Sequence, residues 1–259
     1  MEDLLQLKNK NFVIMGVAND RSIAWGVAKA LHQVGANLIF TYRKERSLGK
    51  LNKLLEKNEI QATLIAECDV NSDESIEAAF KKIGEEAGTV HGVIHSVAFA
   101  HSEDLNGEFI NTSRSGYAFA QDTSAYSFIA VAKAVKPLMT EGGSLVAMSY
   151  LGAERAVEGY NVMGVAKAAL ESSVKYLALD LGKDNIRVNA ISAGPIRTLA
   201  AKGISDFNQI LHKVEEKAPL KRNVTQAEVG DMTVVLLSHL SRGVTGEIVH
   251  VDAGYNIVG

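Results

Sequence analysis

The sequence contains little cysteine and no excess of charge of either sign. Cys68 is the only cysteine among 259 residues, which excludes an intramolecular disulfide framework and favours a reducing compartment. Because Cys68 ends an apolar stretch, we interpret it as a core thiol rather than a nucleophile. Lys and Arg number 27 against 30 Asp and Glu. This balance does not point to nucleic acid or an anionic membrane as the main partner.

Long hydrophobic runs are also missing. No stretch approaches the roughly 18 apolar residues of a membrane-spanning helix, and residues 1–12 lack the cationic start and apolar core of a signal peptide. We therefore expect a cytoplasmic protein without a membrane partner. The seven histidines do not cluster with cysteine or carboxylates at the spacing of metal ligands, so no metal site is predicted.

Short apolar runs alternate with helical patterns along the whole chain. The expected strands cover residues 12–15, 38–41, 62–66, 92–95, 144–148, 187–191 and 247–251. The expected helices cover residues 22–34, 43–57, 72–86, 113–139, 158–181, 205–216 and 226–239. This alternation predicts a parallel sheet with helices on both faces. Without a repeat or linker, residues 1–259 are expected to form one doubly wound α/β domain of the Rossmann type, with about seven strands.

The first strand-to-helix turn is a candidate cofactor site. Ligands of doubly wound sheets bind beyond the carboxyl ends of the strands. Gly16 begins this turn, and a helix that starts near Ser22 offers free N–H groups to a pyrophosphate. The strict G-x-G-x-x-G pattern is absent, so a purely structural turn is the alternative. The regular alternation of strands and helices favours the dinucleotide site.

The ends of the next two strands bear on the type of dinucleotide. No carboxylate follows the second strand, whereas Arg43 and Lys44 do. Both suit a 2′-phosphate, which favours NADPH and leaves NADH possible. The alternative is that they are solvated residues opening a helix, although cations there oppose the helix dipole. After the third strand, Asp69 either contacts the adenine together with Val70 or lies near the cap of the following helix.

Two residues of the helical pattern at 158–181 suggest a catalytic pair. Tyr160 and Lys167 are seven residues apart, which places them on one helical face. The ammonium group is expected to lower the pKa of Tyr160 and to make its hydroxyl a usable proton donor. The alternative is a half-buried tyrosine and a solvated lysine. Residues 193–205 form an apolar, alanine-rich turn, which we interpret as a substrate-covering lid rather than a connector.

Together these residues resemble the short-chain dehydrogenase/reductase superfamily and, within it, the bacterial enoyl-acyl-carrier-protein reductases. The resemblance rests on Gly16-x5-Ser22-Ile-Ala-x-Gly26, His95-Ser96-x-Ala98-Phe99-Ala100, Tyr150-Leu-Gly, Tyr160-Asn-Val-Met-Gly-x-Ala-Lys167 and Arg187-Val-Asn-Ala-Ile-Ser-Ala-Gly-Pro-Ile-Arg-Thr198. Typical members of the superfamily place a tyrosine four residues before the lysine and a serine thirteen before that tyrosine. Met163 and Tyr150 occupy those positions here. This spacing is similar to that of the enoyl reductases and disfavours a 3-oxoacyl or carbonyl reductase.

The resemblance implies a reaction and a set of site residues. The reaction is NADPH-dependent reduction of trans-2-enoyl thioesters in type II fatty-acid elongation. Lys167 is implied to hold the nicotinamide ribose, and Tyr160 is implied to donate a hydrogen bond to the thioester carbonyl oxygen. Tyr150 is implied to line the site near the substrate. The implied substrate contacts are Ala100, Tyr150 and Tyr160. The implied cofactor contacts are Gly16, Ser22, Ile23, Asp69, Val70, Val97, Lys167, Ile196, Arg197, Thr198, Leu199 and Ala200.

The resemblance also implies two kinds of partner. The substrate is expected to arrive on acyl-carrier protein, and the chain is expected to assemble as a homotetramer. A non-catalytic regulator that binds a dinucleotide is the alternative from another functional class. The presence of Tyr160, Lys167 and a lid segment disfavours it.

Overall fold

The chain folds around one parallel sheet. The structure is a computed structural model that describes residues 4–199, 201 and 207–258. Its strands are β1 (Asn11–Met15), β2 (Asn37–Tyr42), β3 (Leu64–Glu67), β4 (Gly92–His95), β5 (Gly143–Ser149), β6 (Ile186–Ala193) and β7 (Ile248–Val251). They pair in the order β3-β2-β1-β4-β5-β6-β7, and each neighbouring pair is parallel. The predicted doubly wound fold is confirmed, with its change of direction between β1 and β4.

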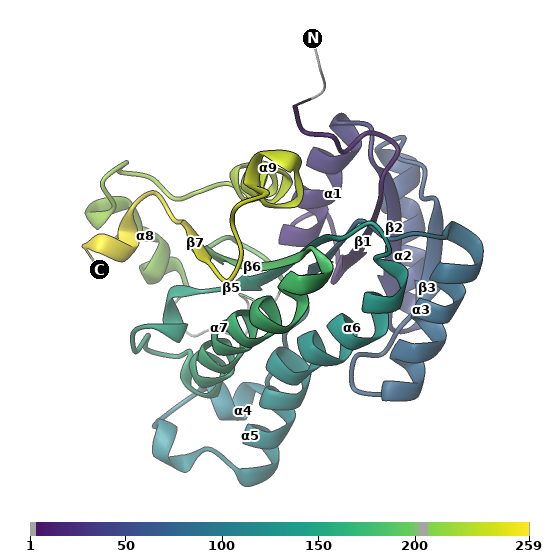
Figure 1. Cartoon of the computed structure of the whole chain (residues 1–259). Coiled ribbons are helices and arrows are strands. Elements are labelled where there is room, and N and C mark those ends of the chain that lie inside the picture. Colours follow the sequence, from purple (N-terminus) through teal and green to yellow (C-terminus); the bar gives the residue numbers. More distant parts are fainter. Residues whose placement is uncertain (1–3, 200, 202–206, 259) are drawn as a thin grey trace.

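Helices cover both faces of this sheet (Figure 1). One face carries α1 (Ile23–Gln33), α2 (Glu45–Lys57) and α9 (Gln226–Leu237), and the other carries α3 (Asp73–Ala87), α6 (Ser127–Val135) and α7 (Asn161–Leu181). The remaining α-helices of the described residues are α4 (Ser102–Leu105), α5 (Arg114–Gln121) and α8 (Phe207–Lys217). In the part of the chain that the structure describes, no helix is both long and apolar enough to cross a bilayer.

The strands in the middle of the sheet bury both of their faces, whereas β3 and β7 at its two edges are only partly buried. Along β1, Val13 and Met15 pack toward α3, α6 and α7, whereas Phe12 and Ile14 pack toward α1 and α9. All four side chains are fully buried. Double coverage explains why the strands read as continuous apolar runs rather than as alternating ones.

Cys68 lies between β3 and α3 and is buried. Burial raises the pKa of its thiol to about 12, and the neighbouring carboxylate of Asp69 adds to the effect. A thiol of this kind stays protonated and unreactive at neutral pH. The interpretation of Cys68 as a core thiol is confirmed.

Several element boundaries differ from those expected. The third strand occupies Leu64–Glu67 rather than 62–66, and α7 begins at Asn161 rather than near residue 158. The single helix expected at 113–139 is divided into α5, a π-helical turn at Asp122–Tyr126, α6 and a final 3₁₀ turn. Hydrophobic periodicity locates such segments but not the turn where the helical register changes.

The π-helical turn is held by contacts with distant parts of the chain. The Asn71 amide donates to Asp122 Oδ2 at 2.9 Å and to Thr123 Oγ1 at 2.7 Å. Ser124 Oγ accepts from the backbone N–H of Phe99 at 3.0 Å and donates to its carbonyl at 3.2 Å. The irregular turn therefore anchors the loop that follows β4.

Candidate active site

The residues predicted to form the site come together at one edge of the sheet. Because all seven strands are parallel, their carboxyl ends share that edge. The predicted positions follow six different strands: Gly16 after β1, Arg43 after β2, Asp69 after β3, Val97 after β4, Tyr150 after β5 and Ile196 after β6. Residues that are far apart in the sequence are thereby collected along one edge.

Gly16 lies where the loops after β1 and β4 touch. Its φ is +94°, and a Cβ there would lie 2.0 Å from the carbonyl oxygen of Ser96. Both the backbone conformation and the close approach require glycine. This contact sits between β1 and β4, where the strand order reverses and dinucleotides bind in folds of this type.

The amino-terminal end of α1 faces this edge. Ser22 is the N-cap residue, yet its side chain makes no capping bond to the helix and donates instead to the Asn19 carbonyl at 2.5 Å. The first N–H groups of α1, including that of Ile23, therefore receive no side-chain acceptor from Ser22. An anionic group is the natural partner for such amides, so the turn fits the pyrophosphate of a dinucleotide.

A cavity of about 840 Å³ separates this turn from the segment after β6. Its lining includes residues 19–21, Thr198 and Leu199, so the first turn and the predicted lid share one space. Arg197 is tied to α8, because its Nη1 donates to Asn208 Oδ1 at 2.5 Å. Ala200 and residues 202–205 lie outside the described residues, so the predicted contact of Ala200 and the far part of the lid stay predictions.

The ends of β2 and β3 are joined by an ion pair. Arg43 Nε lies 3.2 Å from Asp69 Oδ2, and both side chains are partly exposed. Helix α2 begins at Glu45, after Arg43 and Lys44, with an acidic residue in its first turn. The expected start of this helix at residue 43 was wrong by two residues, but Lys44 is its N-cap residue and so still places a cation at the positive end of the helix dipole.

Asp69 is not the cap of α3. That position belongs to Ser72, whose hydroxyl accepts from the N–H of Ser75 at 3.2 Å. Asp69 Oδ1 accepts from the N–H of Asn71 at 3.1 Å, which leaves its second oxygen to Arg43. The carboxylate thus organises the loop after β3, beside the buried Val70.

Two tyrosines pack together beyond the end of β5. The rings of Tyr150 and Tyr160 meet edge to face with centroids 4.9 Å apart. A Cβ on Gly152 would lie 2.4 Å from the Tyr160 ring and 3.3 Å from the Tyr150 ring. The glycine of the Tyr-Leu-Gly motif therefore makes room for both rings. Tyr160 is 9% exposed, and its hydroxyl makes no hydrogen bond to any of the described residues.

Lys167 lies within α7, seven residues beyond Tyr160. Its side chain is buried, and its Nζ donates to the Met148 carbonyl at 2.6 Å. Burial lowers the pKa of Lys167 to about 8, and the carboxylate of Glu171 acts in the opposite direction. The alternative of a solvated lysine is thus ruled out by its position.

The expected lowering of the Tyr160 pKa is wrong. Burial raises the pKa of Tyr160 well above its ordinary value, and Tyr150 and Glu171 raise it further. The phenolate is disfavoured because the ring is almost enclosed, while the ammonium of Lys167 is directed to a backbone carbonyl. Tyr160 also precedes the helix as its N-cap residue. It is therefore a neutral hydroxyl, suited to donating a hydrogen bond.

Four polar residues near the site did not emerge from the sequence. Ser149 Oγ donates to Glu171 Oε1 at 2.5 Å in a buried contact. Glu154 Oε1 and His250 Nε2 form an ion pair of 2.6 Å. Only Glu171 could have been found from the sequence, because it follows Lys167 by four residues and so shares its helical face. The contacts with Ser149 and with β7 had no local signal.

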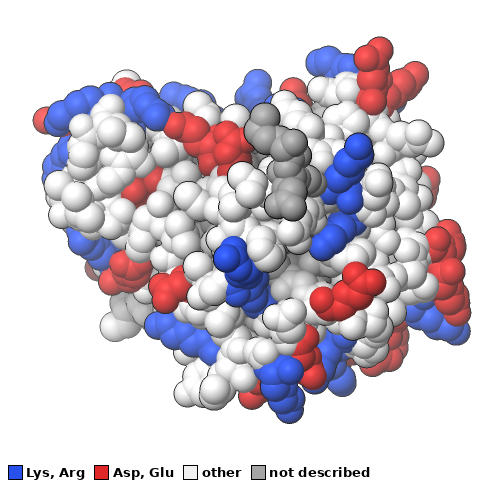
Figure 2. Space-filling view, turned by 45° about the horizontal axis from the view of Figure 1, so that its top comes forward, with Lys and Arg blue, Asp and Glu red and all other residues white. Residues whose placement is uncertain are grey.

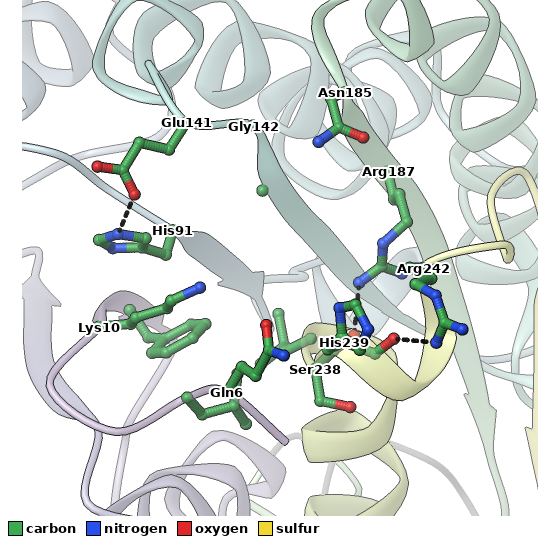
Figure 3. Close-up of a pocket in the computed structure, with 14 residues that line it drawn as sticks. Gln6, Lys10, His91, Glu141, Gly142, Asn185, Arg187, Ser238, His239 and Arg242 are labelled. Atoms are coloured by element: carbon green, nitrogen blue, oxygen red, sulfur yellow. Dashed lines mark hydrogen bonds and ion pairs between the residues drawn. The ribbon is translucent and has the colours of Figure 1, made fainter. Parts of the chain in front are cut away.

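A smaller cavity lies at the opposite, amino-terminal edge of the sheet (Figure 3). It measures about 150 Å³, and its wall includes Lys10, His91, Glu141, Arg187 and Arg242. His91 faces Glu141 across 3.5 Å. The Arg187 guanidinium donates to the carbonyls of Leu236, Ser238 and Val244. The bonds to Leu236 and Ser238 satisfy carbonyls at the end of α9, so this cavity is part of the structural framework.

Charged side chains do not form a large patch of one sign on the face shown in Figure 2, where Lys and Arg are interspersed with Asp and Glu. Among the described residues, no group of three or more His, Cys, Asp or Glu side chains is arranged to hold a metal ion. The sequence-based expectation of a metal-free protein stays a prediction.

Comparison with known proteins identifies the family. Residues 16–256 match the family described as Enoyl-(Acyl carrier protein) reductase. The chain is 59% identical to the enoyl-[acyl-carrier-protein] reductase [NADH] FabI of Bacillus cereus, with 98% of this chain and 99% of that protein covered. It is 60% identical to the enoyl-[acyl-carrier-protein] reductase [NADPH] FabI of Staphylococcus aureus strain MRSA252, with 98% of this chain and 100% of that protein covered. The chain belongs to the enoyl-acyl-carrier-protein reductases.

A solved structure of similar sequence supports the reductase fold. The Bacillus cereus enoyl-acyl carrier protein reductase, determined with NADP⁺ and an indole naphthyridinone, superposes on this reductase with a TM-score of 0.95 at 59% identity. The match covers 98% of each chain. The family, the fold and the enzyme class expected from the sequence are confirmed: this reductase is an NAD(P)H-dependent oxidoreductase.

Proposed function

We propose that Tyr150, Tyr160 and Lys167 carry out enoyl reduction at the carboxyl edge of the sheet. The protein is an enoyl-acyl-carrier-protein reductase of fatty-acid synthesis. The observation that supports these three roles is the arrangement at the end of β5, where the rings of Tyr150 and Tyr160 lie 4.9 Å apart and the Met148 carbonyl accepts a hydrogen bond from buried Lys167. We also infer that residues 1–259 work as a single catalytic domain in the cytoplasm.

The residues at this edge fit a nicotinamide dinucleotide. Gly16 allows close approach of backbone, and Ser22 and Ile23 begin a helix suited to a pyrophosphate. We expect Asp69 and Val70 to contact the adenine, and Val97 and residues 196–199 to contact the nicotinamide half. When bound, the reduced cofactor supplies the hydride that is added to the β-carbon of the enoyl thioester.

The protein groups act on the thioester end of the substrate. As hydride reaches the β-carbon, negative charge develops on the thioester oxygen. The neutral hydroxyl of Tyr160 donates a hydrogen bond to that oxygen, which stabilises the enolate. Tyr150 packs against the Tyr160 ring and limits its rotation. Ala100, in the loop anchored by Ser124, lies on the substrate side.

Lys167 has two roles in this proposal. Its ammonium group holds the nicotinamide ribose through donors not used by the Met148 carbonyl. Its positive charge also favours the enolate that develops nearby. Both roles require the protonated amine, so the enzyme is expected to lose activity as the pH rises through the pKa of Lys167, about 8.

We propose that Arg43 and Lys44 make the enzyme favour NADPH, with NADH as the alternative cofactor. Relatives of similar identity are named for either cofactor. Replacing Arg43 and Lys44 together with glutamine should raise KM for NADPH several-fold more than KM for NADH, because only NADPH carries the 2′-phosphate. Steady-state kinetics with both cofactors measures this. Lys53→Gln, an exposed change within α2, is the control, and equal effects on both cofactors would contradict the assignment.

Self-association into a homotetramer is the second proposed feature. Tyr176 and Leu179 project from α7 with 71% and 77% of their surface exposed, and Ile257 and Val258 are exposed near the carboxyl terminus. Exposed apolar groups of this size suit a contact between copies. Light scattering at micromolar concentration is expected to give four times the 27.8 kDa chain mass. A monomeric mass would count against the assembly.

The catalytic proposal is tested by following reduced-nicotinamide absorbance with a short trans-2-enoyl thioester. The substrate is offered on acyl-carrier protein and on a small thiol carrier, with a 3-oxoacyl thioester as the control. Oxidation with the enoyl substrate alone supports the proposed chemistry, and faster turnover of the carrier-protein form supports that partner. Oxidation with the 3-oxoacyl compound would support the competing carbonyl-reductase mechanism.

A further inference from the structure

The roles proposed above leave the buried carboxylate of Glu171 without a task. Glu171 lies on α7 and is 8% exposed. A carboxylate in such a place is costly unless it is hydrogen-bonded or paired with a cation. It lies one helical turn beyond Lys167, on the same face of the helix. Its position therefore calls for an explanation that involves the active site.

Helix α7 is attached to the end of β5 at two consecutive residues. Lys167 Nζ donates to the carbonyl of Met148 at 2.6 Å, and Ser149 Oγ donates to Glu171 Oε1 at 2.5 Å. Tyr150 is the next residue of the chain, and its ring packs on Tyr160 at the start of the same helix. The two bonds thus fix how the strand end that carries Tyr150 lies against the helix that carries Lys167.

The charges around this attachment couple Glu171 to Lys167. Burial lowers the pKa of Lys167, and Glu171 raises it. Burial also raises the pKa of Glu171, whereas the hydrogen bond from Ser149 lowers it. The serine therefore helps to keep the carboxylate ionised, and the ionised carboxylate helps to keep the lysine protonated.

Other titratable groups face this pair from the surrounding elements. From β4, His95 is buried with a pKa lowered to about 3, first by burial and then by Lys167. It is neutral, and its Nε2 is bonded to Ser127 Oγ at 2.8 Å. Beside Glu171, Glu154 raises its pKa, and His250 on β7 lowers it. These two side chains lie 2.6 Å from each other, and Glu171 is the carboxylate that acts on Lys167.

We propose that Glu171 is a positioning residue for enoyl reduction: bonded to Ser149, its carboxylate keeps Lys167 charged and seated against the end of β5, beside Tyr150 and Tyr160. The inference rests on the roles of Lys167 and Tyr160 proposed above. It adds a residue that touches neither substrate nor cofactor and acts through Lys167.

Glu171→Gln separates the charge from the hydrogen bond. The amide oxygen can still accept from Ser149, while the negative charge is lost. The alkaline limb of the kcat/KM profile is expected to move to lower pH by about one unit, the size of effect that one nearby opposite charge produces. Near pH 6 the variant should match the wild type, and above pH 8 it should be slower by roughly tenfold, which follows from that same unit. Profiles from pH 6 to 10 with a saturating enoyl thioester and varied NADPH measure this.

Two further variants make the test decisive. Glu86→Gln removes an exposed carboxylate of α3 and is the control that should leave the limb unmoved. Ser149→Ala removes the donor to Glu171 and should shift the limb in the same direction by a smaller amount. If Glu171→Gln does not fold, Ser149→Ala tests the proposal in its place. Equal loss of activity at every pH in Glu171→Gln, with the limb in place, would show a structural role alone and overturn the proposal.

Failure of this inference is distinguishable from failure of the catalytic roles. If the wild-type chain reduces the enoyl thioester and Glu171→Gln leaves the alkaline limb unmoved, only the inference fails. NADPH binding, followed by fluorescence over the same pH range, gives a second readout without turnover. If wild-type turnover is absent, the pH above which NADPH affinity falls is compared instead. A lower value in Glu171→Gln than in the wild type still supports the coupling of Glu171 to Lys167, and an unchanged value rejects it.

Discussion

Tyr160→Phe is expected to lower kcat for enoyl reduction by about 10²–10³-fold, the usual cost of removing one donor to a developing oxyanion. The change deletes a single oxygen and keeps the ring that packs at 4.9 Å from Tyr150. Because the Tyr160 hydroxyl bonds none of the described residues, the free energy of unfolding should change little. Single-turnover kinetics with the enoyl thioester, together with urea unfolding, measures both quantities.

A matched control is Tyr126→Phe, which removes the same atom from a residue that is 48% exposed at the end of the π-helical turn. Its kcat should equal that of the wild type. The role assigned to Tyr160 would be wrong if Tyr160→Phe retained wild-type kcat, or if its loss of activity were accompanied by an equivalent loss of stability.

Gly16→Ala should weaken both the fold and cofactor binding. A Cβ at this position meets the Ser96 carbonyl oxygen at 2.0 Å, and the residue has φ of +94°. The backbone conformation costs roughly 1–3 kcal/mol for a residue with a side chain, and the overlap costs about 1–3 kcal/mol more. The loops after β1 and β4 must separate, which displaces the turn proposed to hold the pyrophosphate. Urea unfolding and NADPH titration measure the two effects.

Gly49→Ala is the control for this change. Gly49 lies within α2, and a Cβ added there would meet no other atom within 4 Å. Because alanine favours a helix interior over glycine, this variant should be more stable by up to about 1 kcal/mol and should bind NADPH normally. If the two variants shifted stability in the same direction, close packing at Gly16 would not be the reason for its glycine.

The order of strands and helices followed from local pattern. The central strands of a sheet covered on both faces bury almost every side chain, so residues 92–95 and 144–148 stand out as apolar runs without any knowledge of their neighbours. The helices show their buried stripe at a period of 3.6 residues. Element boundaries were less certain, as at residues 62–66 and 113–139, because contacts such as that of Asn71 with the π-helical turn come from distant sequence.

The common edge of the sheet where we propose the site was also predictable from the sequence. Parallel strands place their carboxyl ends together, so residues that follow successive strands had to share one edge. The spacing of Tyr150, Tyr160 and Lys167 pointed to the family through resemblance. Sequence spacing alone, however, contained no measure of how deeply these side chains are enclosed.

Enclosure and long-range pairing were decided only by the tertiary structure. Burial reversed the expected direction of the Tyr160 pKa and lowered that of Lys167, because a charged group loses more solvation than a neutral one when it leaves water. Arg43 met Asp69, and Ser149 met Glu171, through contacts between separate elements. Local sequence determined the elements and their common edge, whereas the protonation of the proposed catalytic groups depends on what the folded chain packs around them.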